Sequence, residues 1–446
     1  MSSAELDGGG LAELDRRYIW HPFTQQQGWL AEDAPIIRSA EGCTLTDVNG
    51  KTYLDGISSL WCNVHGHRHP TIDRAVQEQL GRVAHTTMLG LSHEPAIELA
   101  RRLVELSPGR LTRVFYSDSG STATEIALKI AFQYQQQSGS PERTRFLTMR
   151  DAYHGDTIGA VSAGGIDLFH ATYGPMLFDT IKATPGDFDE IEQIFAREGK
   201  TLAAVIMEPI VQGAAGMIIQ PNGYLRKVRE LCDRYEVLLI LDEVATGFGR
   251  TGTMFACQQE GVEPDMMCVA KGLTGGYLPL AATLTSEEIY SSFLGEHHEF
   301  KTFFHGHTYT GNPLACAAGI ATLDVFEREE TLDHVADLSV MFGRLLEPIA
   351  RLERVAEVRR RGLMVGIELA GFPVEARAGH QVTLAARRRG AIIRPLGDTV
   401  VLMPPLAISV KELERLVEIT AEAIAEVSAD AASRHEPVVS RTKVSA

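Results

Sequence analysis

The chain is short of long apolar runs, of positive charge and of secretion signals. No stretch approaches eighteen consecutive apolar residues, which disfavours a membrane-spanning helix. Lys and Arg number 42 against 58 Asp and Glu, for a formal net charge of −16, so nucleic acid and anionic membranes are disfavoured as partners. The N-terminus has neither a basic segment nor an apolar segment of the kind that begins a signal peptide. A cytoplasmic protein is therefore expected.

Cysteine and histidine do not form a metal-binding pattern. The six cysteines are scattered and include no Cys-x-x-Cys pair, as is typical of free thiols in a reducing compartment. His65, His67 and His69 alternate along the chain, but no nearby acid or cysteine completes a tetrahedral set. We therefore expect no metal site.

Three familiar catalytic or nucleotide-binding motifs are absent or out of context. There is no Gly-x-Ser-x-Gly elbow and no P-loop. Gly247-Phe-Gly249-Arg-Thr-Gly252 matches the dinucleotide fingerprint, but its strand ends in Asp-Glu and no clear amphipathic helix follows. A dinucleotide is therefore disfavoured as the ligand.

What is present indicates an α/β fold with a large and a smaller domain. The 446 residues are too many for one small core, and 44% of them are hydrophobic. Apolar runs near 115, 147, 206, 240 and 268 alternate with helical stretches, which predicts a mostly parallel sheet covered on both faces. We predict an N-terminal arm with part of the small domain in 1–65, a large domain in 66–330, a C-terminal small domain in 331–430 and a disordered tail in 431–446.

Polar residues gather where the predicted strands end. Ligands of open α/β sheets bind at the carboxyl ends of the strands. The residues at or just past these ends are Ser119-Gly120-Ser121, Tyr153, Glu208, Asp242 and Lys271. This convergence predicts one ligand site.

The Gly-Ser turn suits a phosphate, because a helix begins there and its first N–H groups face outward. Thr122 and Glu125 have the spacing of a capping box. An aromatic residue such as Tyr153 either stacks on a planar ring or belongs to the core, and the sequence leaves both interpretations open.

Lys271 and Asp242 suggest a covalently held cofactor. A lysine amine with a pKa of roughly 10.4 is a poor nucleophile at neutral pH, but apolar surroundings help it lose its proton and form a Schiff base. Pyridoxal phosphate needs such a lysine, an acid for its pyridinium nitrogen, a phosphate cradle and a flat contact for its ring. The chain offers one candidate for each role.

Over residues 16 to 427 the chain resembles the class III pyridoxal-phosphate aminotransferases of fold type I. The resemblance rests on Asp242-Glu-Val-Ala-Thr-Gly-Phe-Gly-Arg-Thr-Gly and on Ala270-Lys-Gly-Leu-Thr-Gly-Gly. Further marks are Trp20-His-Pro-Phe-Thr, Ser58-Ser-Leu-Trp, Tyr153-His-Gly-Asp-Thr, Glu208-Pro-Ile-Val-Gln-Gly, His305-Gly-His-Thr and Arg394-Pro-Leu-Gly. Within the family these marks are most similar to the branch that converts 8-amino-7-oxononanoate to 7,8-diaminononanoate in biotin synthesis.

The resemblance implies a homodimer with shared active sites and a role for each matching residue. Lys271, Asp242 and Tyr153 would be catalytic. The cofactor-binding residues would be Gly120, Ser121, Tyr153, Glu208, Asp242, Val244, Lys271 and, from the neighbouring subunit, Thr308. The substrate-binding residues would be Phe23, Leu60, Trp61, Gly306, His307 and Arg394, the last pairing with the substrate carboxylate.

Three positions depart from the pattern of members that use S-adenosylmethionine as amino donor. Those members usually have Tyr in place of Phe23, a Trp pair in place of Leu60-Trp61, and Pro in place of His307. The donor is therefore S-adenosylmethionine or lysine. The rival functions are another class III ω-amino-acid transaminase and, from a different class, a non-catalytic ligand-binding protein on the same scaffold.

The aromatic arm from Arg16 to Thr24 has two interpretations. It packs on the core of its own chain, or it reaches a ligand site, which could belong to a partner subunit.

Overall fold

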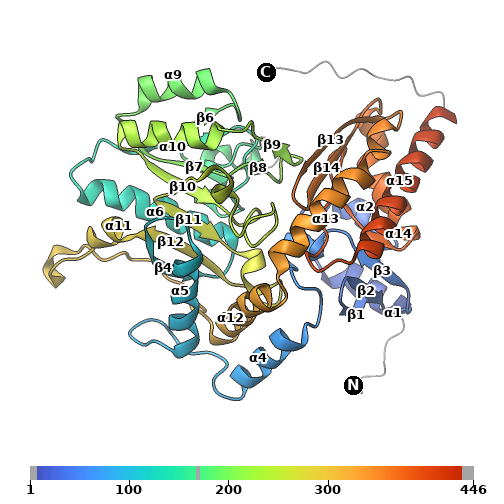
Figure 1. Ribbon diagram of the computed structural model, residues 1–446, viewed down its shortest axis with the longest axis horizontal. Helices are drawn as coiled ribbons and strands as arrows, with labels where there is room; N and C mark the ends of the chain where they lie inside the picture. Colours follow the sequence, from blue (N-terminus) through green and yellow to red (C-terminus); the bar gives the residue numbers. More distant parts are fainter. Residues whose placement is uncertain (1–7, 167–170, 434–446) are drawn as a thin grey trace.

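The computed structural model describes residues 8–166 and 171–433 and is organised around one seven-stranded sheet (Figure 1). The strand order is β4-β12-β11-β10-β7-β5-β6. The bounds are β4 Leu111–Ser117, β5 Arg145–Met149, β6 Ile181–Ala183, β7 Leu202–Met207, β10 Leu238–Asp242, β11 Met266–Val269 and β12 Ala281–Ser286. Six of these strands run in one direction, because β12 is antiparallel to both β11 and β4.

The sheet is mostly parallel, as predicted, and β12 is the strand that departs from the common direction. The segment Ala281–Ser286 consists of small residues, threonines and one leucine. It lacks the long apolar run by which the other central strands were recognised, although all six of its residues are buried. Neighbouring elements bury this strand, although its own side chains give no apolar signal in the sequence.

Helices cover both faces of this sheet, which explains why its strands are apolar on both sides. In β10, Leu239 and Leu241 pack into a core shared with α5 (Glu94–Leu106), α10 (Tyr224–Tyr235) and α12 (Pro313–Arg328). Ile240 points to the other face and packs with α6 (Gly120–Gln137). Around them lie α4 (Pro70–Leu80), α7 (Ile158–Ala163), α9 (Phe188–Glu198) and α11 (Glu287–Ser291).

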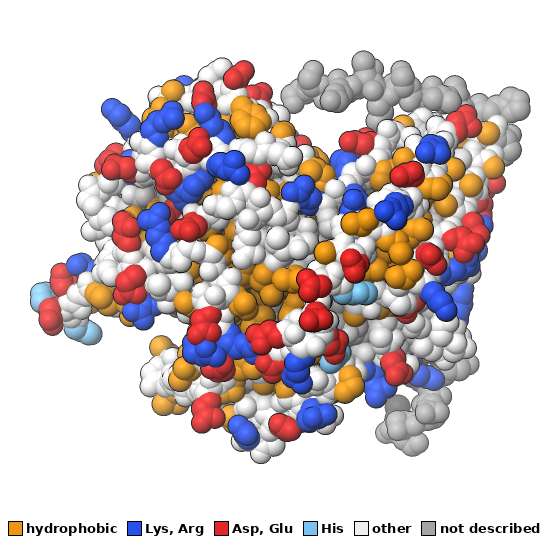
Figure 2. All heavy atoms as spheres, viewed as in Figure 1, with side chains coloured by type: hydrophobic (Ala, Val, Ile, Leu, Met, Phe, Trp, Pro, Cys, Tyr) orange, Lys and Arg blue, Asp and Glu red, His pale blue; other side chains and the backbone are white. Residues whose placement is uncertain are grey.

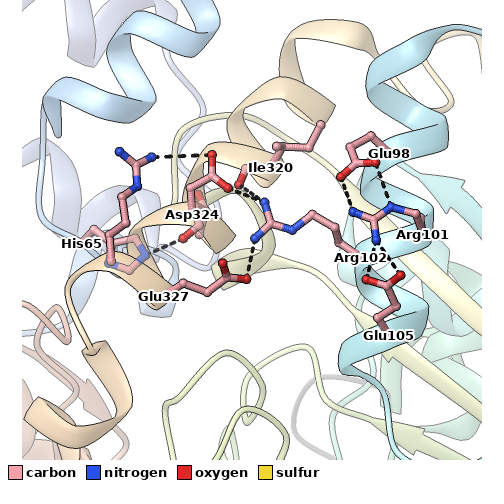
Figure 3. Close-up of polar contacts among 10 residues, drawn as sticks. His65, Glu98, Arg101, Arg102, Glu105, Ile320, Asp324 and Glu327 are labelled. Carbon is pink, nitrogen blue, oxygen red and sulfur yellow. Dashed lines mark hydrogen bonds and ion pairs between the residues drawn. The ribbon is translucent and has the colours of Figure 1, made fainter.

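A buried arginine joins two of the covering helices. Arg102 of α5 reaches α12, where its guanidinium donates to the carbonyl of Ile320 (3.1 Å) and to the carboxylates of Asp324 and Glu327 (Figure 3). The Nε2 atom of His65 lies 3.0 Å from the carbonyl of Thr322 on the same helix. Burial lowers the pKa of His65 to about 3, so this histidine is neutral and acts as a packing residue.

The smaller part of the molecule is built from both ends of the chain. Its C-terminal sheet has the order β13-β14-β17-β16, and all its pairs are antiparallel. The N-terminal sheet β1-β2-β3-β15 takes its last strand from the C-terminal region, since Ala391 and Ile392 pair in parallel with Leu54 and Asp55. The bounds are β1 Ile37–Glu41, β2 Thr44–Asp47, β3 Thr52–Asp55, β13 Val355–Arg361, β14 Met364–Leu369, β15 Ala391–Ile392, β16 Arg394–Leu396 and β17 Thr399–Leu402.

Among the described residues, further helices belong to the two ends of the chain. They are α1 Gly8–Tyr18, α2 Gln26–Leu30, α13 Thr331–Leu346, α14 Ala378–Arg388 and α15 Val410–Ser433. Helix α15 continues three residues into the segment predicted as a disordered tail, which corrects that boundary. The rest of the predicted tail, 434–446, lies outside the described residues.

The surface agrees with the mixed composition of the sequence. Acidic and basic side chains are interspersed over the face shown in Figure 2. Within 8–166 and 171–433, no helix combines the length and the apolar character that a bilayer crossing requires.

Candidate active site

Five of the predicted site positions lie at one edge of the large sheet. Asp242 is the last residue of β10, Glu208 directly follows β7, and Lys271 comes two residues after β11. Gly120 and Tyr153 follow β4 and β5. Because these five strands run in the same direction, their carboxyl ends meet at the same edge.

Lys271 begins a short 3-10 turn and is held in a left-handed conformation, with φ of 45°. Its Nζ lies 5.3 Å from the centre of the Trp61 ring. Burial lowers the pKa of the amine, and the carboxylates of Asp242 and Glu208 oppose that shift. A lysine amine that loses its proton more easily is a better nucleophile.

The carboxylate of Asp242 is held by a histidine to which the sequence analysis assigned no role. The Nδ1 atom of His154 lies 2.7 Å from Asp242 Oδ2, and both side chains are buried. The backbone N–H of Val244 donates to Oδ1 (3.1 Å). The position of His154 in the sequence could have indicated this role, because His154 follows Tyr153 in the loop after β5, at the same edge as the other candidates.

Glu208 is a buried carboxyl group between two backbone donors. It accepts hydrogen bonds from the N–H of Gly213 (2.9 Å) and from the N–H of Tyr153 (3.3 Å). Burial, reinforced by the charge of Asp242, raises its pKa to about 7. Glu208 is therefore poised to gain or lose a proton near neutral pH.

Helix α6 begins where the sequence predicted a phosphate cradle, but its cap differs from the prediction. The capping box joins Ser119 to Thr122, not Thr122 to Glu125. Glu125 instead accepts hydrogen bonds from the hydroxyl of Thr157 (2.7 Å) and the N–H of Ala160 (3.1 Å). The box therefore lies one turn earlier than predicted, because Glu125 is recruited by another loop.

The first turn of α6 approaches Val244 closely. A Cβ added to Gly120 would lie 2.5 Å from a methyl group of Val244, so only glycine fits there. The N–H groups of Gly120 and Ser121 belong to the first turn, where an α-helix provides no partner for them. This geometry suits an anion.

Tyr153 lies at the sheet edge and is partly exposed, outside the apolar clusters of the core. Its hydroxyl donates to Asp156 Oδ2 (2.8 Å). Burial and the neighbouring Asp156 raise the pKa of this tyrosine, whereas the charge of Arg394 lowers it. Arg394 therefore comes close enough to the sheet edge to act on Tyr153.

A cavity of about 1410 Å³ lies between the N-terminal segment and the smaller part of the molecule. Phe23 of the arm and Trp29 of α2 line it together with Arg394, whereas Lys271 and Asp242 do not. Burial lowers the pKa of the Arg394 guanidinium. Phe23 of the arm thus lines a cavity of its own chain.

The remaining predicted site residues are not enclosed within this chain. Gly306 and Thr308 are exposed, and Leu60 is 49% exposed. The Nδ1 atom of His307 lies 2.7 Å from Asp118 Oδ2, at the start of the loop that leads to Gly120.

The three alternating histidines have separate partners. His65 contacts Thr322, His67 contacts Asp55 (2.9 Å) and His69 contacts Glu329 (3.0 Å). In the part of the chain that the structure describes, no three His, Cys, Asp or Glu side chains are grouped as ligands for a metal ion.

Comparison with known proteins identifies the family. Residues 31–424 match the family model "Aminotransferase class-III". A relative from Nitratidesulfovibrio vulgaris, named adenosylmethionine-8-amino-7-oxononanoate aminotransferase, is 55% identical over 94% of this chain and 82% of its own. The crystal structure of a protein of the same name from Methanocaldococcus jannaschii superposes with a TM-score of 0.93, with 43% identity over 94% of this chain and 99% of that one.

A more distant structural neighbour carries another name. It is an amine transaminase from an uncultivated Pseudomonas species, determined with pyridoxal phosphate bound. Its TM-score is 0.87, with 35% identity over 92% of this chain and 99% of that one.

The chain therefore belongs to the class III aminotransferases and has their fold, fold type I. Members of this family generally depend on pyridoxal phosphate and act on small molecules. Several relatives that are 42–55% identical to this chain share the name adenosylmethionine-8-amino-7-oxononanoate aminotransferase.

The raised pKa of Glu208 predicts a pH-dependent stability. The folded protein binds this proton more tightly than the unfolded chain, so the free energy of unfolding falls as the pH rises from about 4.5 to about 7. Glu208→Gln removes this dependence. We expect cofactor-free wild type to lose on the order of 3 kcal/mol relative to Glu208→Gln between pH 5 and 8, measured by denaturant unfolding. Parallel pH profiles for the two proteins would contradict the shifted pKa.

Proposed function

We propose that this protein is a pyridoxal-phosphate-dependent aminotransferase that converts 8-amino-7-oxononanoate to 7,8-diaminononanoate in biotin synthesis. The observation that carries the reaction class is the Lys271 amine, set against Trp61 with its pKa lowered, at the sheet edge that also holds Asp242. The substrate rests on the shared name of the relatives and on the half-buried Arg394 beside this edge.

The residues present fit pyridoxal phosphate. Gly120 leaves the first turn of α6 open beside Val244, and a side chain there would fill the space. Asp242 offers a buried carboxylate for a protonated ring nitrogen, and His154 holds it in place. In the described parts of the chain, 8–166 and 171–433, no hydrogen bond engages Lys271 Nζ, so the amine is available for a covalent link.

Bound at this edge, the cofactor would supply an electron sink that makes the C–H bond beside the substrate's amino group acidic. Lys271 would then act as the base and acid that moves this proton. Asp242 would hold the negative charge that faces the ring nitrogen. The N–H groups of Gly120 and Ser121 would bind the phosphate, and Tyr153 and Val244 would enclose the ring.

Arg394 would bind the carboxylate of 8-amino-7-oxononanoate. A guanidinium fork suits two-point binding of a carboxylate, and partial burial strengthens the pair. Phe23, Leu60, Trp61, Gly306 and His307 would form the wall that receives the two substrates. The donor is S-adenosylmethionine, which the relatives' name supports, or lysine, as the departures at Phe23, Leu60 and His307 suggest.

The active form would be a homodimer, with Thr308 completing the phosphate site of the partner subunit. Thr308 is exposed in the single chain, and large apolar side chains near it are exposed as well. Phe304 is 75% exposed, Phe300 69% and Tyr309 59%, which is the kind of surface that subunit contacts bury. The six cysteines are all free, which supports the cytoplasm as the location.

A second candidate is another class III ω-amino-acid transaminase, because one structural neighbour is named an amine transaminase. A purely ligand-binding role is disfavoured by the Lys271 amine, since binding alone does not require a nucleophile there.

The decisive test of function is the reaction itself. The purified protein with pyridoxal phosphate should form 7,8-diaminononanoate from 8-amino-7-oxononanoate with S-adenosylmethionine or lysine as donor, followed by mass spectrometry. Lys271→Ala should abolish turnover and prevent borohydride from fixing the cofactor to the chain. Amino transfer from simple ω-amino acids alone would support the second candidate, and a protein that takes up no cofactor would support the ligand-binding alternative.

Replacing Arg394 should affect one half of the reaction. We expect Arg394→Ala to lower kcat/KM for 8-amino-7-oxononanoate, because the substrate carboxylate loses a partly buried partner. The loss should correspond to roughly 2–5 kcal/mol of transition-state stabilisation. The half-reaction with the donor should change far less. Arg377→Ala is the matched control, because Arg377 lines the same cavity but is exposed. Equal losses in both half-reactions would place the carboxylate elsewhere.

Thr308 predicts complementation between subunits. Lys271→Ala and Thr308→Asp proteins should each be inactive, the second because its carboxylate repels the phosphate. Refolding them together forms mixed dimers in which one site has the intact Lys271 of one chain and the intact Thr308 of the other. We therefore expect activity to return on mixing. If the mixture stays inactive while the mixed dimer is present, Thr308 does not act across the interface.

A further inference from the structure

Residues Ser58–Trp61 form a left-handed turn that contains no glycine. Their φ angles are 44°, 47°, 77° and 68°. A residue with a Cβ is disfavoured in a left-handed helical conformation, because its Cβ comes too close to the following carbonyl oxygen. A run of four such residues persists only where surrounding contacts hold it.

The carboxylate of Asp55, at the end of β3, accepts hydrogen bonds from this turn. Asp55 is 1% exposed. Its Oδ1 accepts a hydrogen bond from the backbone N–H of Ser59 (2.9 Å). Its Oδ2 accepts a hydrogen bond from the hydroxyl of Ser59 (2.7 Å) and lies 2.9 Å from the Nε2 atom of His67. One carboxylate therefore binds both the backbone and the side chain of the second residue of the turn.

His67 extends this contact to the residues after the turn. With Nε2 donating to Asp55, its Nδ1 can accept the side-chain N–H of Asn63 (3.3 Å). His67 thus links the carboxylate of Asp55 to Asn63, which follows the turn. This gives a role to one of the three histidines that could not be assigned from the sequence.

The opposite side of the turn is tied to the C-terminal part of the chain. The hydroxyl of Ser58 donates to the carbonyl of Met403 (2.6 Å). The buried guanidinium of Arg250 donates to Ser58 Oγ and to the carbonyl of Asn63, both at 3.1 Å. The turn is therefore held by hydrogen bonds to Asp55 at Ser59, and by hydrogen bonds to Met403 and Arg250 at Ser58.

Trp61 is the last residue of this turn. The indole is 8% exposed and lies 5.3 Å from Lys271 Nζ. The loop after Lys271 fits directly against the same segment, because a Cβ on Gly276 would lie 2.9 Å from the backbone of Asn63. A change in the handedness of the turn would therefore move Trp61 relative to Lys271.

We propose that Asp55 is a positioning residue that, through Ser59 and His67, holds the Ser58–Trp61 turn left-handed and thereby sets the Trp61 ring against Lys271. The effect on amino transfer rests on the function proposed above. The effect on the position of Trp61 does not, and it can be measured in cofactor-free protein.

The first measurement uses Trp61 as its own probe. The chain has three tryptophans, so Trp20→Phe with Trp29→Phe leaves Trp61 as the single fluorophore. In this background, Asp55→Asn keeps the size of the side chain but places an N–H₂ group against donors. We expect acrylamide to quench Trp61 at least twofold more strongly, with a red-shifted emission, in a protein that still unfolds cooperatively. Unchanged quenching in folded Asp55→Asn would overturn the proposal.

A glycine rescue separates this role from general support of the fold. Adding Ser59→Gly to Asp55→Asn should restore the low quenching, because glycine takes a φ of 47° without strain. Cys62→Gly is the matched control: Cys62 is adjacent to the turn but has a φ of −114°, so glycine relieves nothing there. Failure of Ser59→Gly to rescue, or equal rescue by Cys62→Gly, would contradict the proposal.

A second pair keeps the test valid if Asp55→Asn does not fold. Ser59→Gly and Ser59→Ala both lose the hydroxyl, but only glycine favours the left-handed conformation. The glycine variant should melt several degrees above the alanine variant. Equal melting temperatures would mean that the turn is not strained.

The consequence for the reaction is read from half-reactions of the cofactor-loaded protein. We expect Asp55→Asn to lower the rate of both half-reactions about tenfold with little change in substrate affinity, and Ser59→Gly to restore it. If the fluorescence changes as expected but the rates do not, the turn does not serve the reaction. If no variant, including wild type, transfers an amino group, the proposed function fails while the fluorescence result stands.

Discussion

Two opposite charges at one edge of a sheet set the main constraint on this structure. Asp242 and Lys271 follow adjacent parallel strands, and the register that pairs Asp242 with Cys268 places Lys271 three residues further along. Neither charge is easily kept in apolar surroundings. The carboxylate is therefore held by His154 and the amine faces Trp61 with its pKa lowered. The sheet, the helices that cover it and the loops at its edge all keep this pair in position.

Several of the residues proposed to choose the substrates come from the two ends of the chain. Strand β15 pairs in parallel with β3, so that Ile392 lies opposite Asp55. This single pairing brings Arg394, two residues after Ile392, to the region of the Ser58–Trp61 turn. The arm adds Phe23 to the cavity that Arg394 lines. The proposed substrate recognition would thus depend on contacts between segments more than 300 residues apart in sequence.

Much of the large sheet could be predicted, because its strands are buried on both faces and appear as continuous apolar runs. Strands β4, β5, β7, β10 and β11 include the predicted positions near 115, 147, 206, 240 and 268. Strand β12 could not be found this way, since its small residues and threonines carry no apolar signal. The capping box was placed one turn late, because Thr157 and Ala160 occupy Glu125 and sequence spacing alone does not reveal a competing partner.

The sequence by itself determined the class of chemistry: Lys271 and Asp242 stand at the ends of apolar runs, and a parallel sheet brings such ends together. Only the tertiary structure decided how those groups are held. His154 reaches Asp242 from another loop, and Asp55 holds four residues in a conformation that none of them favours alone. The physical reason is that periodicity and propensity report on neighbours along the chain. A buried hydrogen bond or a left-handed turn depends instead on partners that folding brings from elsewhere.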